Sequence, residues 1–440
     1  MKKALSLAIA AALAAPAVAS AEAIVYGKLN VSLDYADVSN VIRNRVDPAT
    51  GDLVLDANGV PVQVAEDFKG WGFSKGNGFI PGDGRGNRLG VKGSEDLGNG
   101  LKAVYQIELG INFDTNNNLA NNADTVSYRN TFAGLAGNWG TLLAGRHDTP
   151  MKISTGKLDL FSDTMADFNG TVGFLDIRAD TTIAYVSPNW SGFQLALATV
   201  PAGGATATGA TNINSDQING AYSLAAIFSN GPFYASLSNE MFMGTNSSLF
   251  GQAQCVPNPG QVTPVTCNYV DNDWTQWRLG LGLLNWNGFT LTAIYANQDD
   301  IPAGQTFIAS GPGVPGNQAF FLPGGSNSVE QWQIQAGYTF GNFMIKGMYG
   351  QASYDSDTAI AGSLLDPARI QVLDDLYDGS RDTWAIGVDY NFSKRTTAYV
   401  LYTAVTDDQN DIPQFLGQSA LPAPTRQDWD GFSIGLMHSF

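Results

Sequence analysis

Residues 101–111 read LKAVYQIELGI, and this stretch decides the fold class. Apolar and polar side chains alternate along it, with Tyr105 and Ile107 on one parity and Gln106 and Glu108 on the other. Successive side chains of a β-strand point to opposite faces, so this period of two predicts a strand with one apolar face and one polar face. The same alternation recurs in residues 25–35, 332–338 and 431–440.

The connections between such segments alternate in kind along the chain. Every second connection is short and rich in Gly or Asn, and tight turns of this type join antiparallel neighbours. The short connections are residues 95–100, 137–140, 188–192, 230–232, 285–288, 341–342 and 391–394. The long, polar ones lie near residues 36–86, 113–125, 148–180, 201–216, 242–272, 299–328, 355–380 and 407–428.

This asymmetry separates a soluble sheet from a membrane barrel. A soluble sheet covers its apolar face with a second layer and has no reason to keep every second turn short. A barrel of the outer membrane has short periplasmic turns, long extracellular loops and strands whose apolar side chains face lipid. The sequence therefore predicts an all-β fold, a transmembrane antiparallel up-and-down β-barrel of about 16 strands.

The composition supports the same fold class. Of the 440 residues, 14% are charged, and the formal net charge is -17, whereas soluble domains average about 25% charged residues. An acidic chain without clustered Lys and Arg excludes a nucleic-acid partner. The two histidines argue against an enzyme, because His147 and Asp148 are adjacent and would point to opposite faces of a strand. The sequence predicts no catalytic residue, no cofactor and no metal site.

The first residues have the pattern of an export signal. Lys2 and Lys3 precede an apolar run that ends in the small-residue motif Ala19-Ser20-Ala21. We expect residues 1–21 to be cleaved, which leaves residues 22–440 as a single barrel domain. No later stretch approaches the length of apolar sequence that a transmembrane helix needs.

The two cysteines lie in one Pro-, Gly- and Asn-rich segment, residues 251–272. An exported chain leaves the reducing cytosol, so we expect Cys255 and Cys267 to form a local disulfide. A catalytic or metal-binding thiol pair is the alternative, and the distance of both histidines along the sequence disfavours it.

Aromatic residues near the strand ends are candidates for the interfacial girdles of a membrane barrel. For any one of them, ordinary packing is an equal alternative. The candidates are Tyr26, Phe193, Phe233, Trp277, Phe289, Trp332, Phe343, Trp384, Tyr390 and Phe440.

Several segments resemble the Gram-negative general porins, which are trimeric, sixteen-stranded diffusion channels. The most specific are GVKGSEDLGNGLKA at residues 90–103 and GLMHSF at residues 435–440. Further similar segments are residues 24–35, 127–150 and 181–193. The resemblance implies a homotrimer in the outer membrane that passes small hydrophilic solutes and ions by passive diffusion. It also implies that Phe440 is the barrel assembly signal and that the third loop folds inward.

The width of the barrel supports a channel independently, because side chains cannot fill a barrel of about sixteen strands. We place the third loop at residues 147–180. In the resembled family, acidic residues on this loop face a basic cluster on the wall, and here the loop carries Asp148, Asp159, Asp163, Asp167 and Asp176. The basic residues on polar-face parity are Lys28, Arg88, Lys92, Arg129, Arg146 and Arg278.

A charged side chain that faced lipid near the midplane would cost about 2 to 4 kcal/mol, so these residues are expected to face the lumen. We expect the pore constriction to involve Lys28, Arg88, Arg129, Arg146, Asp159, Asp163 and Asp167. Two alternatives stay open. A lumen charge can pair with a loop carboxylate purely for structure, and the spacing of four between Asp159, Asp163 and Asp167 also fits one face of a short solvated helix.

The sequence therefore favours an outer-membrane channel over two other functions. One is a solute-selective channel, and the other is a barrel whose long loops act mainly as a surface-binding or adhesion module. The expected partners are outer-membrane lipid, small hydrophilic solutes and ions.

Overall fold

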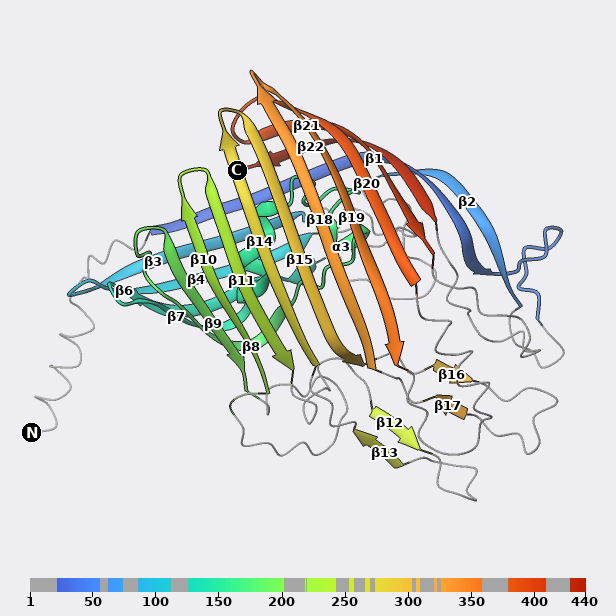
Figure 1. The fold of residues 1–440 in the computed structure, drawn as a ribbon, viewed down its shortest axis with the longest axis horizontal. Coiled ribbons are helices and arrows are strands. Elements are labelled where there is room, and N and C mark those ends of the chain that lie inside the picture. The colour runs from blue at the N-terminus through green and yellow to red at the C-terminus, as the bar shows by residue number, and fades with distance from the viewer. Residues whose placement is uncertain are drawn as a thin grey trace, which may run out of the picture.

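The computed structural model describes residues 22–55, 62–73, 86–111, 126–201, 218, 220–242, 253–256, 266–269, 274–302, 306–308, 320–322, 326–357, 379–408 and 428–440. The expected export signal, residues 1–21, lies outside these ranges. Strands dominate the described chain (Figure 1). They are β1 (Glu22–Asn44), β2 (Gln63–Phe73), β3 (Arg88–Gly98), β4 (Leu101–Ile111), β5 (Val126–Tyr128), β6 (Thr131–Gly137), β7 (Gly140–Asp148), β8 (Arg178–Val186), β9 (Phe193–Val200), β10 (Ala221–Asn230), β11 (Phe233–Phe242), β12 (Ala253–Val256), β13 (Thr266–Tyr269), β14 (Trp274–Trp286), β15 (Phe289–Pro302), β16 (Thr306–Ile308), β17 (Phe320–Leu322), β18 (Ser326–Phe340), β19 (Phe343–Asp357), β20 (Gly379–Asn391), β21 (Thr396–Asp407) and β22 (Trp429–Ser439).

The helical elements are short. They are α2 (Pro150–Thr155), the 3-10 helix η2 (Gly156–Leu158) and α3 (Phe168–Thr171), and all three lie between β7 and β8. Within the described ranges, no helix has the length and apolar character needed to cross a membrane.

The main sheet closes on itself. Eighteen strands join it, and β1 pairs with β22 in antiparallel register, with Lys28 opposite Ser439. The other edge of β1 is shared by β3 and β2, and one edge of β4 is shared by β5 and β6. These two pairs of strands each occupy one position, which leaves sixteen positions around the barrel. The predicted fold class is therefore confirmed.

The connections alternate as the sequence predicts. Short turns join β3 to β4, β6 to β7, β8 to β9, β10 to β11, β14 to β15, β18 to β19, and β20 to β21. The turn between β3 and β4 contains Asn99 and Gly100 at positive φ, a conformation in which Asn and Gly are least strained. The strand ends that the longer connections join lie at the other end of the barrel (Figure 1). Between β11 and β14 the chain forms the β12–β13 hairpin, in which Cys255 lies opposite Cys267.

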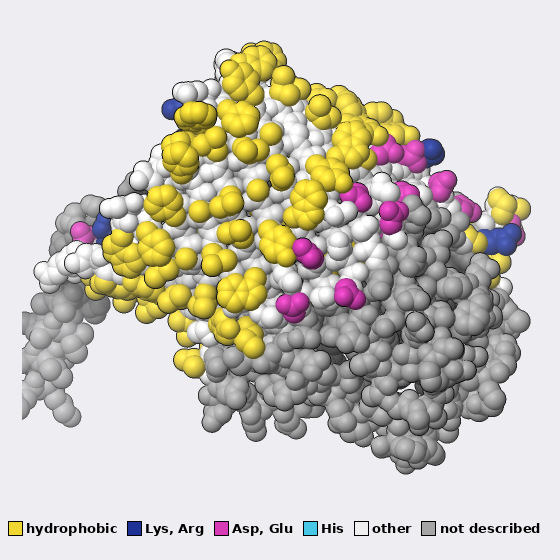
Figure 2. All heavy atoms as spheres, viewed as in Figure 1, with side chains coloured by type: hydrophobic (Ala, Val, Ile, Leu, Met, Phe, Trp, Pro, Cys, Tyr) yellow, Lys and Arg dark blue, Asp and Glu magenta, His cyan; other side chains and the backbone are white. Residues whose placement is uncertain are grey.

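The two faces of the strands differ in the predicted way. In β1, Asn30 and Asp34 are buried inside the barrel, whereas Leu29 and Leu33 are exposed on its outer surface. Figure 2 shows hydrophobic side chains over the outer face of the strands, and Asp and Glu side chains at the edge of this apolar area. Exposed apolar side chains on a closed barrel are typical of a surface that faces lipid.

One residue that was predicted to belong to the aromatic girdle, Tyr26, faces the inside of the barrel and not the lipid. Phe233 and Trp277 are exposed on the outer surface, as expected. Tyr26 instead shares the inward parity of Lys28 and donates a hydrogen bond of 2.8 Å to Glu108 Oε2. The residues next to Tyr26 in the sequence do not indicate this partner, because Glu108 lies on another strand, β4.

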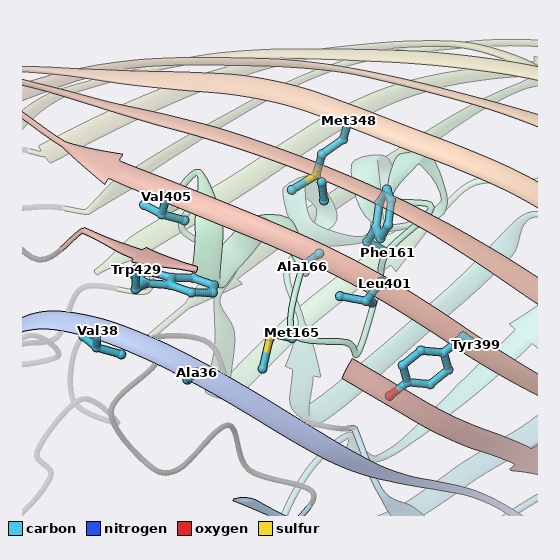
Figure 3. Close-up of a cluster of buried hydrophobic side chains, with 11 residues drawn as sticks. Ala36, Val38, Phe161, Met165, Ala166, Met348, Tyr399, Leu401, Val405 and Trp429 are labelled. Atoms are coloured by element: carbon cyan, nitrogen blue, oxygen red, sulfur yellow. The ribbon is translucent and has the colours of Figure 1, made fainter. Parts of the chain in front are cut away.

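The buried apolar side chains lie inside the barrel. Phe161 and Met165, from the segment between β7 and β8, pack with Val38 of β1, Leu401 of β21 and Trp429 of β22 (Figure 3). A single-layered barrel has no second sheet to cover inward apolar positions, so this segment supplies their packing partner.

Candidate functional site

The segment between β7 and β8, residues 149–177, is here called the inner loop. The strands extend to Asp148 and resume at Arg178, so the loop is shorter than the expected residues 147–180. Its first helix, α2, begins at Pro150, and the Thr149 hydroxyl accepts a hydrogen bond from the Lys152 N–H. Proline at the first helical position and threonine at the N-cap both favour this start.

Side chains of the wall bind the backbone of the inner loop. The Leu160 N–H donates to Gln335 Oε1 at 2.6 Å, and Lys346 Nζ donates to the Leu160 carbonyl at 2.6 Å. Tyr234 donates to the Ser154 carbonyl at 2.5 Å. Buried backbone groups need hydrogen-bond partners, and the lumen faces of β11, β18 and β19 supply these. The inner loop is thus held against one side of the barrel wall.

The first charge cluster joins four wall residues to one residue of the inner loop; its members are Lys28 of β1, Arg88 of β3, Glu108 of β4, Arg129 next to β5, and Asp163 of the loop. Lys28 Nζ lies 2.6 Å from Asp163 Oδ2, and Arg129 Nε lies 2.7 Å from Glu108 Oε1. Arg88 lies between the two carboxylates, 3.9 Å from Glu108 and 3.8 Å from Asp163. The side chains of Arg88, Arg129 and Asp163 are 27%, 23% and 22% exposed, so the cluster faces water.

A second charge cluster lies next to it and consists of Asp148, Lys152 and Arg178. Asp148 Oδ1 lies 3.0 Å from Arg178 Nη2 and 3.3 Å from Lys152 Nζ. Asn130, the neighbour of Arg129 in the sequence, accepts from Arg178 Nε at 2.8 Å and donates to Asp148 at 2.8 Å. This amide joins Asp148 to Arg178 within the second cluster, one residue along the chain from Arg129 of the first.

Three charged residues of the two clusters were not among the candidates named from the sequence: Glu108, Lys152 and Arg178. Glu108 falls on the polar parity of residues 101–111, and that parity is the signal that could have identified it. Arg178 lies inside the range assigned to the third loop, so it was not counted with the strand residues. In the structure Arg178 is the first residue of β8.

Four of the seven expected constriction residues come together, namely Lys28, Arg88, Arg129 and Asp163. Arg146 is placed apart from them. Its guanidinium pairs with Asp180 and donates to the Tyr128 carbonyl at 3.1 Å. Whether any of these residues lines the narrowest level of the lumen stays a prediction.

Asp159 and Asp167 serve the loop's own structure. Asp159 accepts from the Phe161 N–H and from Gln335 Nε2, both at 2.9 Å. Asp167 caps α3 by accepting from the Asn169 N–H at 2.9 Å. Residues 159–167 form turns, so the alternative of a short solvated helix is wrong.

The three aspartates differ in their electrostatics. Burial raises the pKa of Asp159 to about 6, although hydrogen bonds from Gln335 and the Phe161 N–H oppose the shift. Burial and the nearby Asp159 charge raise the pKa of Asp167 well above its usual range. Burial would also raise the pKa of Asp163, but the Lys28 ammonium, aided by Arg88 and Arg129, lowers it below its ordinary value.

Arg278 is a lumen charge that pairs with a loop carboxylate for structure, which is one of the alternatives left open by the sequence. Its Nη1 lies 2.6 Å from Asp176 Oδ1, and the two side chains are 0% and 6% exposed. The same guanidinium donates to Thr155 Oγ1 at 3.0 Å and to the Leu175 carbonyl at 2.9 Å. This pair anchors the inner loop and is shielded from water.

Phe440 lies at the seam of the barrel. Its N–H donates to the Gly27 carbonyl at 3.1 Å, and its carbonyl accepts from the Gly27 N–H at 3.0 Å. The phenyl ring lies over Gly27, where a side chain would clash with it. Its role as an assembly signal stays a prediction. Among the described residues, no group of three or more His, Cys, Asp or Glu is arranged to hold a metal ion.

The profile of the Gram-negative porin family matches residues 6–410. The chain belongs to the Gram-negative porin family. An outer membrane porin protein of Bordetella pertussis is 28% identical over 265 residues, which are 58% of this porin and 64% of that protein. The major outer membrane protein P.IB of Neisseria gonorrhoeae is 25% identical over 72% of this porin and 76% of its own length.

Solved porin structures share the fold. The anion-selective porin from Comamonas acidovorans has a TM-score of 0.56 and 19% identity, and the match covers 96% of this porin and 100% of that chain. The outer membrane channel DcaP of Acinetobacter baumannii has a TM-score of 0.53 and 15% identity over 96% and 97% of the two chains. This porin is therefore an outer-membrane β-barrel of a Gram-negative bacterium.

Proposed function

We propose that this porin is a passive diffusion channel, not an enzyme, and that its narrowest passage lies between the inner loop and the wall that carries the two charge clusters. Small hydrophilic solutes and ions cross it, and small anions cross more readily than cations. The partly exposed charged side chains support a water-filled passage at this level, because ionised groups that face an empty or apolar space would be costly.

The charge balance of the clusters is the observation that carries the anion preference. In the first cluster, three cations share the carboxylates Glu108 and Asp163, and in the second, two cations share Asp148. Each cluster thus has one positive charge in excess. Within the two clusters Glu108 is the most buried carboxylate, at 8% exposed, so the guanidinium groups of Arg88 and Arg129 present more charge to water than it does. Rings of fixed charge at a narrow level set which ions pass.

A structural neighbour supports the same direction. The porin from Comamonas acidovorans is described as anion-selective. The formal net charge of the whole chain, -17, works against this preference, but exposed charges farther than about 8 Å from an ion are largely screened at physiological salt.

The experiment is a reversal-potential measurement on purified porin in a planar bilayer under a KCl gradient. We expect stepwise conductance and a chloride-to-potassium permeability ratio above one. A ratio below one contradicts the anion preference, and absence of conductance contradicts the channel and favours a surface-binding module. Saturation of solute flux or block by one solute class would instead support a solute-selective channel.

We also infer that the porin is a homotrimer. A structural neighbour, OmpT of Vibrio cholerae, is described in a trimer form. Chemical crosslinking in the membrane, followed by native mass measurement in detergent, is expected to give three copies, and a stable monomer in both measurements contradicts the inference.

A further inference from the structure

The wall behind the inner loop carries glycines at inward-facing positions of five strands. Apolar side chains of the inner loop are seated on them. These glycines, here called the wall glycines, are Gly280 and Gly282 on β14, Gly337 on β18, Gly350 on β19, Gly387 on β20 and Gly431 on β22. Leu158 contacts both Gly280 and Gly282. The other contacts are Leu160 with Gly337, Val172 with Gly350, Phe161 with Gly387, and Met165 with Gly431.

The loop approaches the wall more closely than any side chain at these positions allows. A Cβ atom added at Gly280 would lie 2.6 Å from Leu158 Cδ1, and one added at Gly387 would lie 3.1 Å from Phe161 Cε1. Two carbon atoms in favourable contact are about 3.5 to 4.0 Å apart. Even alanine at these sites would therefore push the loop away from the wall or displace its side chains.

The seated side chains also belong to the buried core. Phe161 and Met165 pack in the cluster with Leu401 and Trp429 (Figure 3). Leu158 and Val172 pack in a second buried cluster. Closely packed interiors transmit displacement instead of absorbing it, so a change at the wall is passed to the loop.

The hydrogen bonds to the loop do not set its distance in the same way. Lys346 and Gln335 have long side chains with several rotatable bonds, and they can follow a loop that shifts by a fraction of an ångström. Phe161 and Val172 have few rotatable bonds and are fully buried, so they can turn away from an added Cβ atom only by displacing their neighbours. The wall glycines thus define how far the loop lies from the wall.

We propose that the wall glycines are positioning residues of the channel: they hold the inner loop close to the wall and thereby set the width of the passage on its other side, although none of them faces that passage. This inference rests on the proposed channel function and adds the residues that fix its width. It also implies that the inner loop is a fixed partition and not a swinging gate.

The test uses Gly280→Ala in the full porin, measured as single-channel conductance. The added methyl group meets Leu158, and also Ser236 Oγ at 2.7 Å, a hydroxyl that can rotate away. We expect the loop to move by about 1 Å into the passage and the conductance to fall by roughly a fifth or more. The matched control is Gly347→Ala on the outward parity of β19, where the nearest atom to an added Cβ is the Ala385 carbonyl oxygen at 3.5 Å, an ordinary contact. Its conductance is expected to equal that of the wild type.

A second substitution tests whether the effect passes through the loop. Leu158→Ala removes the closest atom that the new methyl group meets, while Ser236 Oγ at 2.7 Å and Thr155 Cγ2 at 3.2 Å remain. The Leu158→Ala/Gly280→Ala double variant is therefore expected to regain most of the wild-type conductance. A purely structural defect of β14 would not be rescued in this way. Unchanged conductance in a folded Gly280→Ala porin, or a fall that Leu158→Ala does not reverse, overturns the proposal.

A readout independent of conduction separates this proposal from the channel function. Hydrogen exchange of the loop amides, residues 154–172, is expected to quicken in Gly280→Ala and to return to the wild-type rate in the double variant. If Gly280→Ala does not fold, Gly387→Ala with its partner Phe161→Leu gives the same comparison with a milder overlap. Equal exchange in wild type and both glycine variants contradicts the proposal even if the wild-type porin forms no channel.

Discussion

Lys28 Nζ and Asp163 Oδ2 lie 2.6 Å apart, although 135 residues separate them in the sequence. This ion pair joins the first strand of the barrel to the inner loop. It places a loop carboxylate among the cations of the wall, while the backbone of the loop at Ser154 and Leu160 is bound by side chains of β11, β18 and β19. The ion selectivity that we propose depends on this placement.

Arg129→Gln tests the first charge cluster. The substitution removes the cation nearest to Glu108 and leaves Arg88, 3.9 Å away, as the remaining partner. We expect the chloride-to-potassium permeability ratio to fall about two-fold or more, because one fixed positive charge is lost at the narrow level. Arg146→Gln is the comparison, and it should shift the ratio less because Arg146 pairs with Asp180. Equal shifts from the two variants would place both arginines at the same level of the lumen.

Asp163→Asn is expected to act in the opposite direction. Loss of this carboxylate frees the Lys28 ammonium and raises the charge excess of the first cluster by one. The permeability ratio should therefore rise, whereas Lys28→Met should lower it. Reversal potentials measured at low and high salt would test this, since screening reduces both shifts. A shift of Asp163→Asn toward cations contradicts the charge balance described here.

Arg278→Met separates a structural charge from a functional one. Arg278 and Asp176 form a buried pair, and removal of one partner leaves the other charge buried without compensation. Losses of this kind cost about 3 to 5 kcal/mol. We expect a lower unfolding temperature in detergent, followed by circular dichroism, and an unchanged permeability ratio. A changed ratio with unchanged thermal stability would mean that this pair faces the passage.

The pH dependence of the inner loop follows from Asp159 and Asp167. Burial raises the pKa of Asp159 to about 6, so the folded porin favours the protonated carboxyl. Its contribution to stability is complete below the pKa of the unfolded chain, near 3.9, and is lost as the pH rises through about 6. Asp163 has a lowered pKa and stays ionised across this window.

We therefore expect the folded barrel to be more stable at pH 5 than at pH 7.5, by on the order of 1 kcal/mol. The measurement is the unfolding temperature at both pH values. In Asp159→Asn, which cannot ionise, the difference should shrink. A difference of the same size in wild type and variant would assign it to other groups.

The expected disulfide between Cys255 and Cys267 is compatible with the β12–β13 register. Cys255 and Cys267 are directly opposed in an antiparallel pair, and opposed residues have Cα atoms about 4.5 to 5.5 Å apart, within the range that a disulfide bridges. We expect neither cysteine to react with an alkylating reagent until the denatured porin is reduced. Alkylation of both without a reductant contradicts the bond. Conductance should be the same before and after reduction, because the hairpin lies outside the barrel wall.

The parity of the strand residues predicted which basic side chains face inward, and Lys28, Arg88 and Arg129 do so. Their partners could not be predicted in this way. Glu108 meets Arg129 because β4 pairs with β5 and β6 in one particular register, with Leu109 opposite Tyr128. A pattern of alternating faces contains no information about register between strands that are not joined by a tight turn.

The contacts of the inner loop could be predicted even less well from the sequence than those of the strands. Asp159, Asp163 and Asp167 have equal spacing in the sequence, yet their contacts differ. Asp159 accepts hydrogen bonds from Gln335 of the wall and from the Phe161 N–H, Asp163 pairs with Lys28, and Asp167 caps α3. Asp163 adopts a positive φ of 60°, which turns its side chain away from the direction of its neighbours. No periodicity describes a segment of turns, because each residue has its own backbone conformation.

The sequence by itself determined that this chain is a lipid-facing barrel with short turns at one end, because alternation along a strand and the chemistry of tight turns are local properties. The path of the inner loop, the sharing of carboxylates in the two clusters and the use of glycine as a seat for loop side chains were decided only by the tertiary structure. Each of these depends on contacts between residues far apart in the sequence, such as Lys28 with Asp163, and a local pattern does not specify such contacts.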